Sequence, residues 1–493
     1  MTDTVIVPHS GQELAHRLAV SAASQLLARS AHLVLNVVTS VVVVRYLGSD
    51  GYGDYAKVIV IVGWAGLLSD AGLPKIALRI AASDRVRIED VVGTVTLLRL
   101  ALSVVGAIVT QAALTLVHAS PTVRVAGAVA CLMFVVEALL STMLLFQATL
   151  RQQFEGYVRV LMEVAEFAML LVVISRHGGL VQLFLAPIVG GAVGAVVGWL
   201  LARRRFGQRP AWNQELAHDL VRLALPVAPG ILLGALTLKL DGVMVATLGT
   251  TREVGAYTAA FQPVEYVFLA LGAVVAYPFL PVLSRTYGSD HATFLGTYQR
   301  ACELVVILTL PIAAVAVVDG DHMIRAVYGT GWHDAVRPFQ LLSCSLAFMA
   351  ISGWHGFVLL AGDRQIDSLR YGSVALVASA LMCLVLVPPL GPTGGALAVL
   401  VANFVGMVYS TRIVRSKLMV SPHLPVIGRI LAASVIVLGL LLLLHVASAP
   451  WWSNVLSAGP LYLIALWVCR VVRASDLRIL KPHVSPDADL SLS

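Results

Sequence analysis

The chain has 493 residues, of which 58% are hydrophobic and 12% charged, and its mean hydropathy is +0.87. Soluble proteins carry about 25% charged residues, so this composition excludes an ordinary soluble domain and makes the lipid bilayer the main solvent. The formal net charge of +7 does not indicate nucleic-acid binding, because the basic residues are dispersed between apolar segments instead of forming one patch. The sequence therefore predicts an all-α, polytopic membrane protein.

The apolar residues fall into long runs, and a helix that crosses the bilayer needs about 20 of them. The chain offers about fourteen such stretches, which we number as predicted spans in chain order. They lie near residues 18–45, 54–74, 91–117, 123–147, 157–175, 180–202, 220–247, 254–283, 299–318, 337–361, 370–388, 393–412, 426–447 and 455–473. A glycine run at 190–198 has the small-residue spacing that predicts close packing of two helices.

The basic residues give the predicted spans a direction. Lys and Arg concentrate in every second connection, and the positive-inside rule assigns those connections to the cytoplasm. The cytoplasmic set includes the tail at 1–17, the linker at 203–219 and the tail at 474–493. Basic residues are few in the opposite connections, which hold Arg45, Arg124, Arg176, Arg252, Arg325 and Arg337. We therefore expect both termini in the cytoplasm.

A repeat divides most of the chain into two halves. The segment 47–56 after the first predicted span is echoed after the seventh by Leu248-Gly249 and Gly255-Ala256-Tyr257. Other matches keep an offset of roughly 201 to 213 residues, which covers an even number of spans, so the halves are parallel. We expect two six-helix lobes around a central cavity, followed by two added C-terminal helices. The expected parts are the N-lobe at 18–202, the C-lobe at 220–412 and the added pair at 426–473.

Several of these segments resemble one known family. Residues 45–56 and 72–79 resemble the first two spans of the bacterial polysaccharide (Wzx-type) flippases, in the multidrug/oligosaccharidyl-lipid/polysaccharide exporter superfamily. Residues 241–257 are similar to that family's span 7 and the turn after it. Residues 327–335, with Trp332, are similar to its connection between spans 9 and 10. The resemblance covers nearly the whole chain.

The resemblance implies a function and a location. Such a protein lies in the bacterial inner membrane and moves undecaprenyl-pyrophosphate-linked oligosaccharide from the inner to the outer leaflet by alternating access. Its product would feed exopolysaccharide, capsule or O-antigen synthesis, with polymerase and chain-length proteins of the same pathway as further partners. No cofactor is implied.

The candidates for substrate binding are basic side chains in or near the membrane. A charge at the middle of the bilayer costs about 2.5–3.5 kcal/mol, so buried charged residues usually face a cavity or a partner. Guanidinium groups bind pyrophosphate oxygens bidentately, and a lysine supplies a point charge. The candidates are Arg29, Arg99 and Lys239 within spans, and Arg79, Arg151 and Arg300 near cytoplasmic ends. The alternative is that these long side chains extend to the membrane interface.

Acidic residues in the spans are the candidates for ion coupling, with a proton or sodium as the counter-ion. They are Glu137, Glu163, Glu166, Asp241 and Glu265. A buried carboxyl can bind and release a proton as access alternates, whereas the alternative is a structural ion pair with one of the arginines. Lys239 and Asp241 are two residues apart and point to different sides of a helix, so we expect each to have another partner.

Two other transporter functions and one enzymatic function are alternatives for this chain. A multidrug or cation antiporter of the same superfamily would favour acids over arginines in its cavity, and a lipid II flippase is barely separable by sequence. A membrane glycan polymerase or ligase would need a large external loop with catalytic residues. The longest external connection, 319–336, is too short for a domain, and its amphipathic pattern predicts a helix in the membrane interface. We therefore expect a transporter without catalytic residues. The five cysteines have no metal-ligand spacing, so no metal site is expected either.

Overall fold

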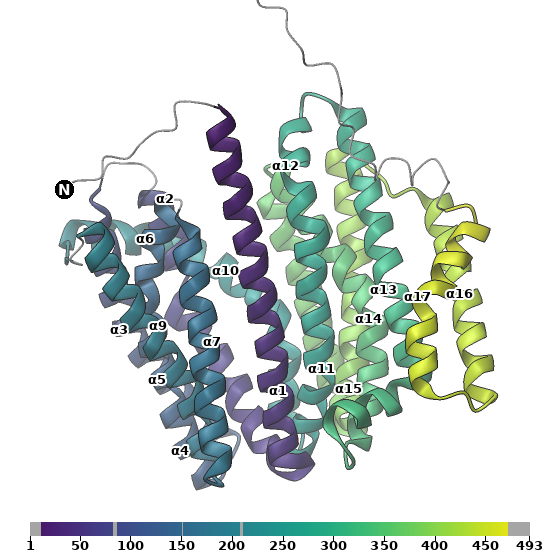
Figure 1. The fold of residues 1–493 in the computed structure, drawn as a ribbon, viewed down its shortest axis with the longest axis horizontal. Coiled ribbons are helices and arrows are strands. Elements are labelled where there is room, and N and C mark those ends of the chain that lie inside the picture. Colours follow the sequence, from purple (N-terminus) through teal and green to yellow (C-terminus); the bar gives the residue numbers. More distant parts are fainter. Residues whose placement is uncertain (1–10, 82–85, 150, 208–210, 472–493) are drawn as a thin grey trace, which may run out of the picture. The chain divides into compact units, whose positions relative to one another are not determined.

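The computed structural model shows an α-helical protein (Figure 1). It describes the chain except residues 1–10, 82–85, 150, 208–210 and 472–493, and except the side chains of 11–30, 152, 205–206, 226–238 and 276–277. Every regular element of the described residues is a helix, as hydrocarbon requires of a chain that must satisfy its own backbone hydrogen bonds. The all-α prediction is confirmed.

The helices follow the predicted apolar stretches closely. In the first half they are α1 Gly11–Asp70, α2 Leu73–Ala81, α3 Ile88–Leu116, α4 Pro121–Ala130, α5 Leu132–Leu139, α6 Met143–Ala148, α7 Gln152–Ser175, α8 Leu180–Leu183 and α9 Leu185–Phe206. In the second half they are α10 Gln214–Leu248, α11 Thr251–Leu271, α12 Tyr277–Thr286, α13 His291–Tyr328, α14 His333–Ala361, α15 Gln365–Leu418, α16 Leu424–Val446 and α17 Trp451–Val468. A 3₁₀ turn, Leu140–Thr142, lies between α5 and α6, and a π-helical turn, Gly272–Ala276, lies between α11 and α12.

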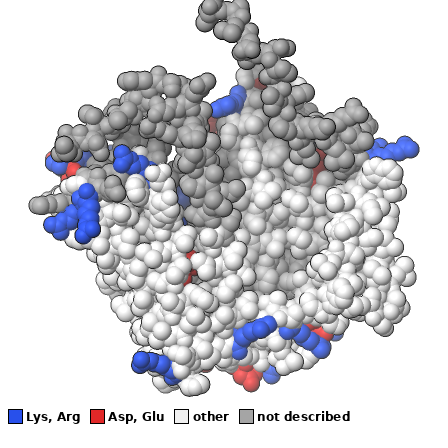
Figure 2. Space-filling view, viewed as in Figure 1, with Lys and Arg blue, Asp and Glu red and all other residues white. Residues whose placement is uncertain are grey.

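Nine helical segments of the described residues are long and apolar enough to cross a membrane. Two of them each contain two predicted spans, because the helix continues through a kink. The kinks lie at Gly48 (φ 65°) and Gly391 (φ 54°), where the backbone enters a region that favours glycine. On the face drawn in Figure 2, Lys and Arg side chains lie toward the helix ends. The protein is thus a multi-pass membrane protein, as predicted.

The chain forms two compact units. Unit 1 comprises Met1–Tyr266, Ile324–Pro338 and Gly372–Ala402, and unit 2 comprises Val267–Met323, Phe339–Tyr371 and Asn403–Ser493. In unit 1, apolar side chains of α2, α3, α6, α9 and α10 pack around the buried Phe146. Helix α9 lies close against α7: a Cβ at Gly190 would stand 2.7 Å from the Met162 carbonyl oxygen. The close packing predicted for the glycine run is therefore confirmed.

Unit 2 is built around α13, α14 and the C-terminal hairpin α16–α17, whose helices lie side by side (Figure 1). Helix α13 continues past its predicted end and bends at Asp319 (φ −116°, ψ 18°) before it ends at Tyr328. The predicted helix in the external connection is therefore present as the last part of α13. Its position in the membrane interface stays a prediction.

Within unit 2, a buried histidine joins three helices through hydrogen bonds at both of its ring nitrogens. His355 of α14 is 1% exposed, and its Nδ1 lies 2.8 Å from Ser410 Oγ of α15. Since the Ser410 hydroxyl donates to the Met407 carbonyl, it accepts from Nδ1–H, and Nε2 accepts from the Tyr298 hydroxyl of α13 at 3.1 Å. The network satisfies the imidazole as the neutral Nδ1–H tautomer.

Candidate functional site

A stripe of polar side chains runs along the membrane-spanning part of α1. His32, Asn36 and Ser40 recur every four residues and therefore share one face of the helix. We call these three residues the α1 polar stripe. At one end of it, His32 Nδ1 lies 2.8 Å from Glu163 Oε1 of α7, and Glu163 is 8% exposed. The stripe thus brings a titratable pair into unit 1.

The rest of the α1 polar stripe faces α11. The Tyr266 hydroxyl donates to Asn36 Oδ1 at 2.8 Å, and the Ser40 hydroxyl donates to Gln262 Oε1 at 2.6 Å. Hydroxyl and amide groups of this kind also bind sugar hydroxyls, which need both donors and acceptors. These residues were not predicted from the sequence, although polar side chains that recur every four residues in an apolar span indicate one polar helix face.

Two of the predicted charged residues, Lys239 and Asp241, have different partners. Lys239 Nζ of α10 lies 2.6 Å from Glu265 Oε1 of α11, and both side chains remain partly exposed, at 48% and 28%. Asp241, which is 6% exposed, accepts a hydrogen bond from the hydroxyl of Tyr257. The expectation that these neighbours in sequence have separate partners is confirmed.

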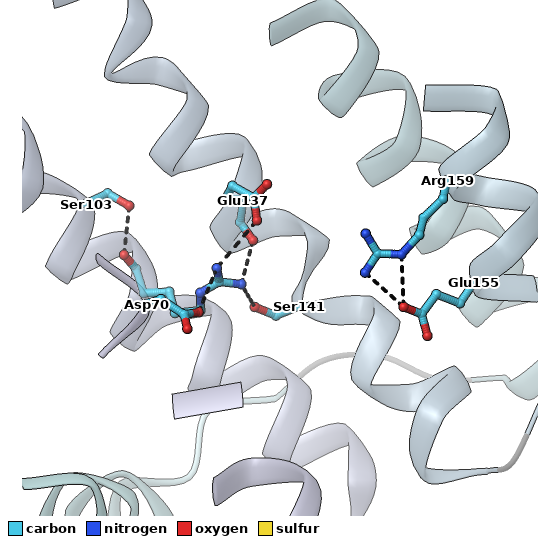
Figure 3. A network of polar contacts seen from close by, with 7 residues as sticks. Asp70, Ser103, Glu137, Ser141, Glu155 and Arg159 are labelled. Atoms are coloured by element: carbon cyan, nitrogen blue, oxygen red, sulfur yellow. Dashed lines mark hydrogen bonds and ion pairs between the residues drawn. The ribbon is translucent and has the colours of Figure 1, made fainter. Parts of the chain in front are cut away.

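Arg99 of α3 belongs to a network of its own (Figure 3). Its Nη2 lies 3.2 Å from Asp70 Oδ1 and 3.6 Å from Glu137 Oε2, while Nη1 donates to the Glu137 carbonyl and to Ser141 Oγ. Arg99 is 8% exposed, so the guanidinium is buried with charges and dipoles around it. For Glu137 the structure contains the ion pair that we considered as the alternative to ion coupling. The role of Arg99 in substrate binding stays a prediction.

Five further predicted residues remain, and the side chain of one of them lies outside the description. Arg29 lies among the side chains that the structure does not describe. Arg79 is exposed in the last turn of α2, and Arg151 is exposed directly before α7 and has a contact there. Arg300 is exposed on α13 in unit 2. Glu166 lies one turn after Glu163 on α7 and is partly buried. The roles of these residues stay predictions.

The two repeated segments meet near the Gly48 kink. A Cβ at Gly53 would overlap the Thr251 carbonyl oxygen and stand 2.7 Å from its carbon, and a Cβ at Gly255 would stand 3.0 Å from Gly53 Cα. Lys57 Nζ donates to Thr251 Oγ1 at 3.0 Å. Backbones can approach this closely only where side chains are missing. The glycines of the two segments therefore form one tight contact within unit 1.

A third segment, from the end of α13 to the start of α14, packs on the same region. Arg45 donates to the carbonyls of Ala326 and Val327 at 2.6 and 2.7 Å, near the end of α13. Tyr52, which is 1% exposed, packs edge-on against Trp332 with ring centroids 5.6 Å apart. We call the contacts of 45–57, 251–259 and 326–332 the closure layer. Buried rings, charge-assisted hydrogen bonds and glycine contacts together leave it tightly packed.

Comparisons with known proteins give the family. Residues 42–337 match the family described as polysaccharide biosynthesis protein. The chain is 30% identical over 200 residues to the probable lipid II flippase MurJ of Rhizobium tropici, and this match covers 38% of the chain and 37% of that relative.

Two solved structures share the fold. The lipid II flippase MurJ in an inward closed conformation gives a TM-score of 0.71 at 12% identity, over 91% of this chain and 98% of that one. An inward-facing multidrug resistance MATE transporter of the MOP superfamily gives 0.61 at 14% identity, over 79% and 94%. Such identities establish the fold alone. The family match covers more than half of the chain, and the protein therefore belongs to the polysaccharide biosynthesis protein family.

Proposed function

We propose that the protein is a flippase that moves an undecaprenyl-pyrophosphate-linked oligosaccharide from the inner to the outer leaflet of the bacterial inner membrane. The family membership and the transporter fold support this reading. The observation that carries it is the partly exposed Lys239–Glu265 pair, which lies next in sequence to the Tyr266 contact with the α1 polar stripe. Lys239 offers a cation for the pyrophosphate, and the α1 polar stripe offers hydrogen bonds for the sugar.

The Lys239–Glu265 pair also suggests how binding and release are coupled. A pyrophosphate oxygen and the Glu265 carboxylate compete for the same ammonium group, so the substrate would displace Glu265 from Lys239. The released carboxylate could then take up the coupling proton or cation, and its return to Lys239 would expel the head group. We call the Lys239–Glu265 pair the charge exchange site. In this scheme Lys239 favours binding of the substrate head group, and Glu265 opposes it.

The closure layer supplies the barrier for alternating access. The positive-inside rule assigns the α10–α11 and α13–α14 connections to the outside and both termini to the cytoplasm. We therefore assign the closure layer to the external side, where it would keep the site closed to the periplasm until the two repeated segments separate.

Transport itself is tested in proteoliposomes that contain the purified protein. We expect labelled undecaprenyl-pyrophosphate oligosaccharide to become accessible on the opposite face faster than in empty liposomes. Lipid II is the second substrate, because the Rhizobium tropici relative is named a probable lipid II flippase. Preference for lipid II would identify the alternative function, and no transport of either lipid would refute a flippase.

Substitutions at the charge exchange site should change substrate affinity in opposite directions. Lys239→Gln should weaken binding of undecaprenyl pyrophosphate about 10-fold or more, because a hydrogen bond to a charged group contributes roughly 1.5–3 kcal/mol. Glu265→Gln should tighten binding and slow turnover, because the competing carboxylate is gone. Binding to the detergent-purified protein measures both values. If both variants weaken binding equally, the pair is only structural.

Glu163 is the proposed coupling residue at the His32 contact. A glutamine at this position keeps the shape but cannot exchange a proton. We expect Glu163→Gln to abolish the stimulation of transport by an imposed pH gradient while leaving slow, gradient-independent transport. The matched control is Glu155→Gln on the same helix, whose partner is Arg159 at 2.9 Å. Equal stimulation in Glu163→Gln and the unmodified protein would exclude Glu163 from coupling.

A further inference from the structure

Within unit 2, the C-terminal hairpin α16–α17 packs on α13 through an apolar contact that has a polar group at one end. Residues Ile430, Ala433, Val437 and Leu441 of α16 follow a helical period and are fully buried. They pack with Val315 of α13 and with buried positions of α17. Apolar contacts of this kind hold helices together but do not fix how far one helix is shifted along another. A polar contact at the end of this row of apolar residues can fix that position.

That polar contact is centred on Asp319, where α13 bends. The Asp319 side chain is 1% exposed, its Oδ2 accepts from Asn454 Nδ2 of α17 at 2.7 Å, and its Oδ1 lies 3.2 Å from His445 Nδ1 of α16. His322, one turn further along α13, places its Nδ1 3.8 Å from the same Oδ1. One carboxylate thus joins the bend of α13 to both helices of the hairpin.

The charge balance at Asp319 depends on histidine. The contacts of its carboxylate among the described residues are Asn454, His445 and His322, and none is Lys or Arg. The other charged groups on this end of α13, Asp321 and Arg325, also have interaction partners. A buried ionised carboxylate requires a paired charge. Among the contacts of Asp319 given above, His445 and His322 can provide it when the imidazole is protonated.

We propose that Asp319, His445 and Asn454 form a proton-dependent latch that fixes the hairpin α16–α17 to the bend of α13. With His445 protonated, the ion pair with Asp319 is complete and the hairpin is held. Loss of that proton leaves the carboxylate with neutral donors in a buried position, which weakens the latch. The side-chain exposure of His445 is 43%, so the imidazole can exchange protons with its surroundings.

The direction of the pH effect follows from the sign of the charges. The ion pair between Asp319 and His445 exists only while the imidazole carries its second proton, so removal of that proton at higher pH breaks it. Histidine is the side chain whose ordinary titration falls between pH 5 and 8. The hairpin should therefore be held firmly at pH 6 and loosened at pH 8. With the orientation proposed above, the latch would respond to the periplasm.

The test is hydrogen–deuterium exchange of the full chain in lipid nanodiscs at pH 6 and pH 8, corrected for intrinsic exchange rates. We expect amides at the α16–α17 turn to lose protection about 10-fold between the two conditions, the factor that corresponds to roughly 1.4 kcal/mol. This readout does not need transport, so failure of the flippase assay leaves the latch test intact. Protection that is equal at pH 6 and pH 8 would overturn the proposal.

Three variants separate the latch from a general pH effect. His445→Gln keeps a hydrogen-bond donor but cannot titrate, and Asp319→Asn removes the charge that needs a partner. Asp319→Asn should make protection of the turn independent of pH, and so should His445→Gln combined with His322→Gln, because His322 lies near the same carboxylate. His177→Asn, an exposed histidine between α7 and α8, should leave the pH response as in the unmodified protein. If either latch variant keeps the full pH response, histidine protonation at Asp319 is not its cause.

Discussion

Gly53→Ala is expected to lower the transport rate about 5-fold or more, because a side chain at this position destabilises the closure layer. The new Cβ would overlap the Thr251 backbone, which cannot rotate away as a side chain can. Overpacking of this kind costs roughly 1–3 kcal/mol, which corresponds to a loss of about 5- to 150-fold in the closed population. Transport in proteoliposomes with matched protein amounts measures the effect.

Alanine substitutions at two further glycines should give smaller transport defects than Gly53→Ala. Gly255→Ala places a Cβ 3.0 Å from Gly53 Cα, so a small backbone shift relieves it and a milder loss is expected. Gly51→Ala meets only the Leu47 side chain, with 3.6 Å to its Cβ, and should transport normally. The expected transport defect therefore decreases in the order Gly53, Gly255, Gly51, according to the space available for a Cβ at each position. A Gly51 variant as defective as the Gly53 variant would contradict the tight glycine contact.

Arg99→Gln is expected to destabilise the protein, whatever its effect on substrate. The guanidinium is buried and has two carboxylate partners, and hydrogen bonds to charged groups contribute roughly 1.5–3 kcal/mol. We expect a loss in this range. Loss of one partner from a fully buried pair would cost more, about 3–5 kcal/mol, but the Glu137 side chain is 61% exposed. Thermal unfolding in detergent, followed by helical circular dichroism, measures the change.

The control for Arg99 lies in the same view of the molecule (Figure 3). Arg159 pairs with Glu155 one turn away on α7, and its side chain is 51% exposed. Exposed pairs of this spacing contribute about 0.3–0.5 kcal/mol, so Arg159→Gln should unfold at nearly the original temperature. If Arg99→Gln instead keeps full stability and raises only the substrate concentration needed for half-maximal transport, Arg99 binds the head group as the sequence suggested.

Much of the fold could be predicted because it depends on local sequence. Apolar runs of sufficient length must form helices in a bilayer, and α13 and α14 lie where the hydropathy indicated. The glycine run at 190–198 also gave a correct prediction, because only small residues permit such close helix packing. The separate partners of Lys239 and Asp241 followed from helix geometry alone.

The tertiary structure decided which distant residues meet. Sequence reasoning proposed Glu163 but omitted His32, whose partner lies on another helix, and it proposed a repeat but not the contact between Gly53 and Gly255. Asp319 is separated by 126 residues from His445 and by 135 from Asn454. The sequence by itself determined an all-helical membrane body, because hydrophobicity and helix period act within a few turns. Partnerships between charges depend on how helices pack over hundreds of residues, and no local pattern contains that information.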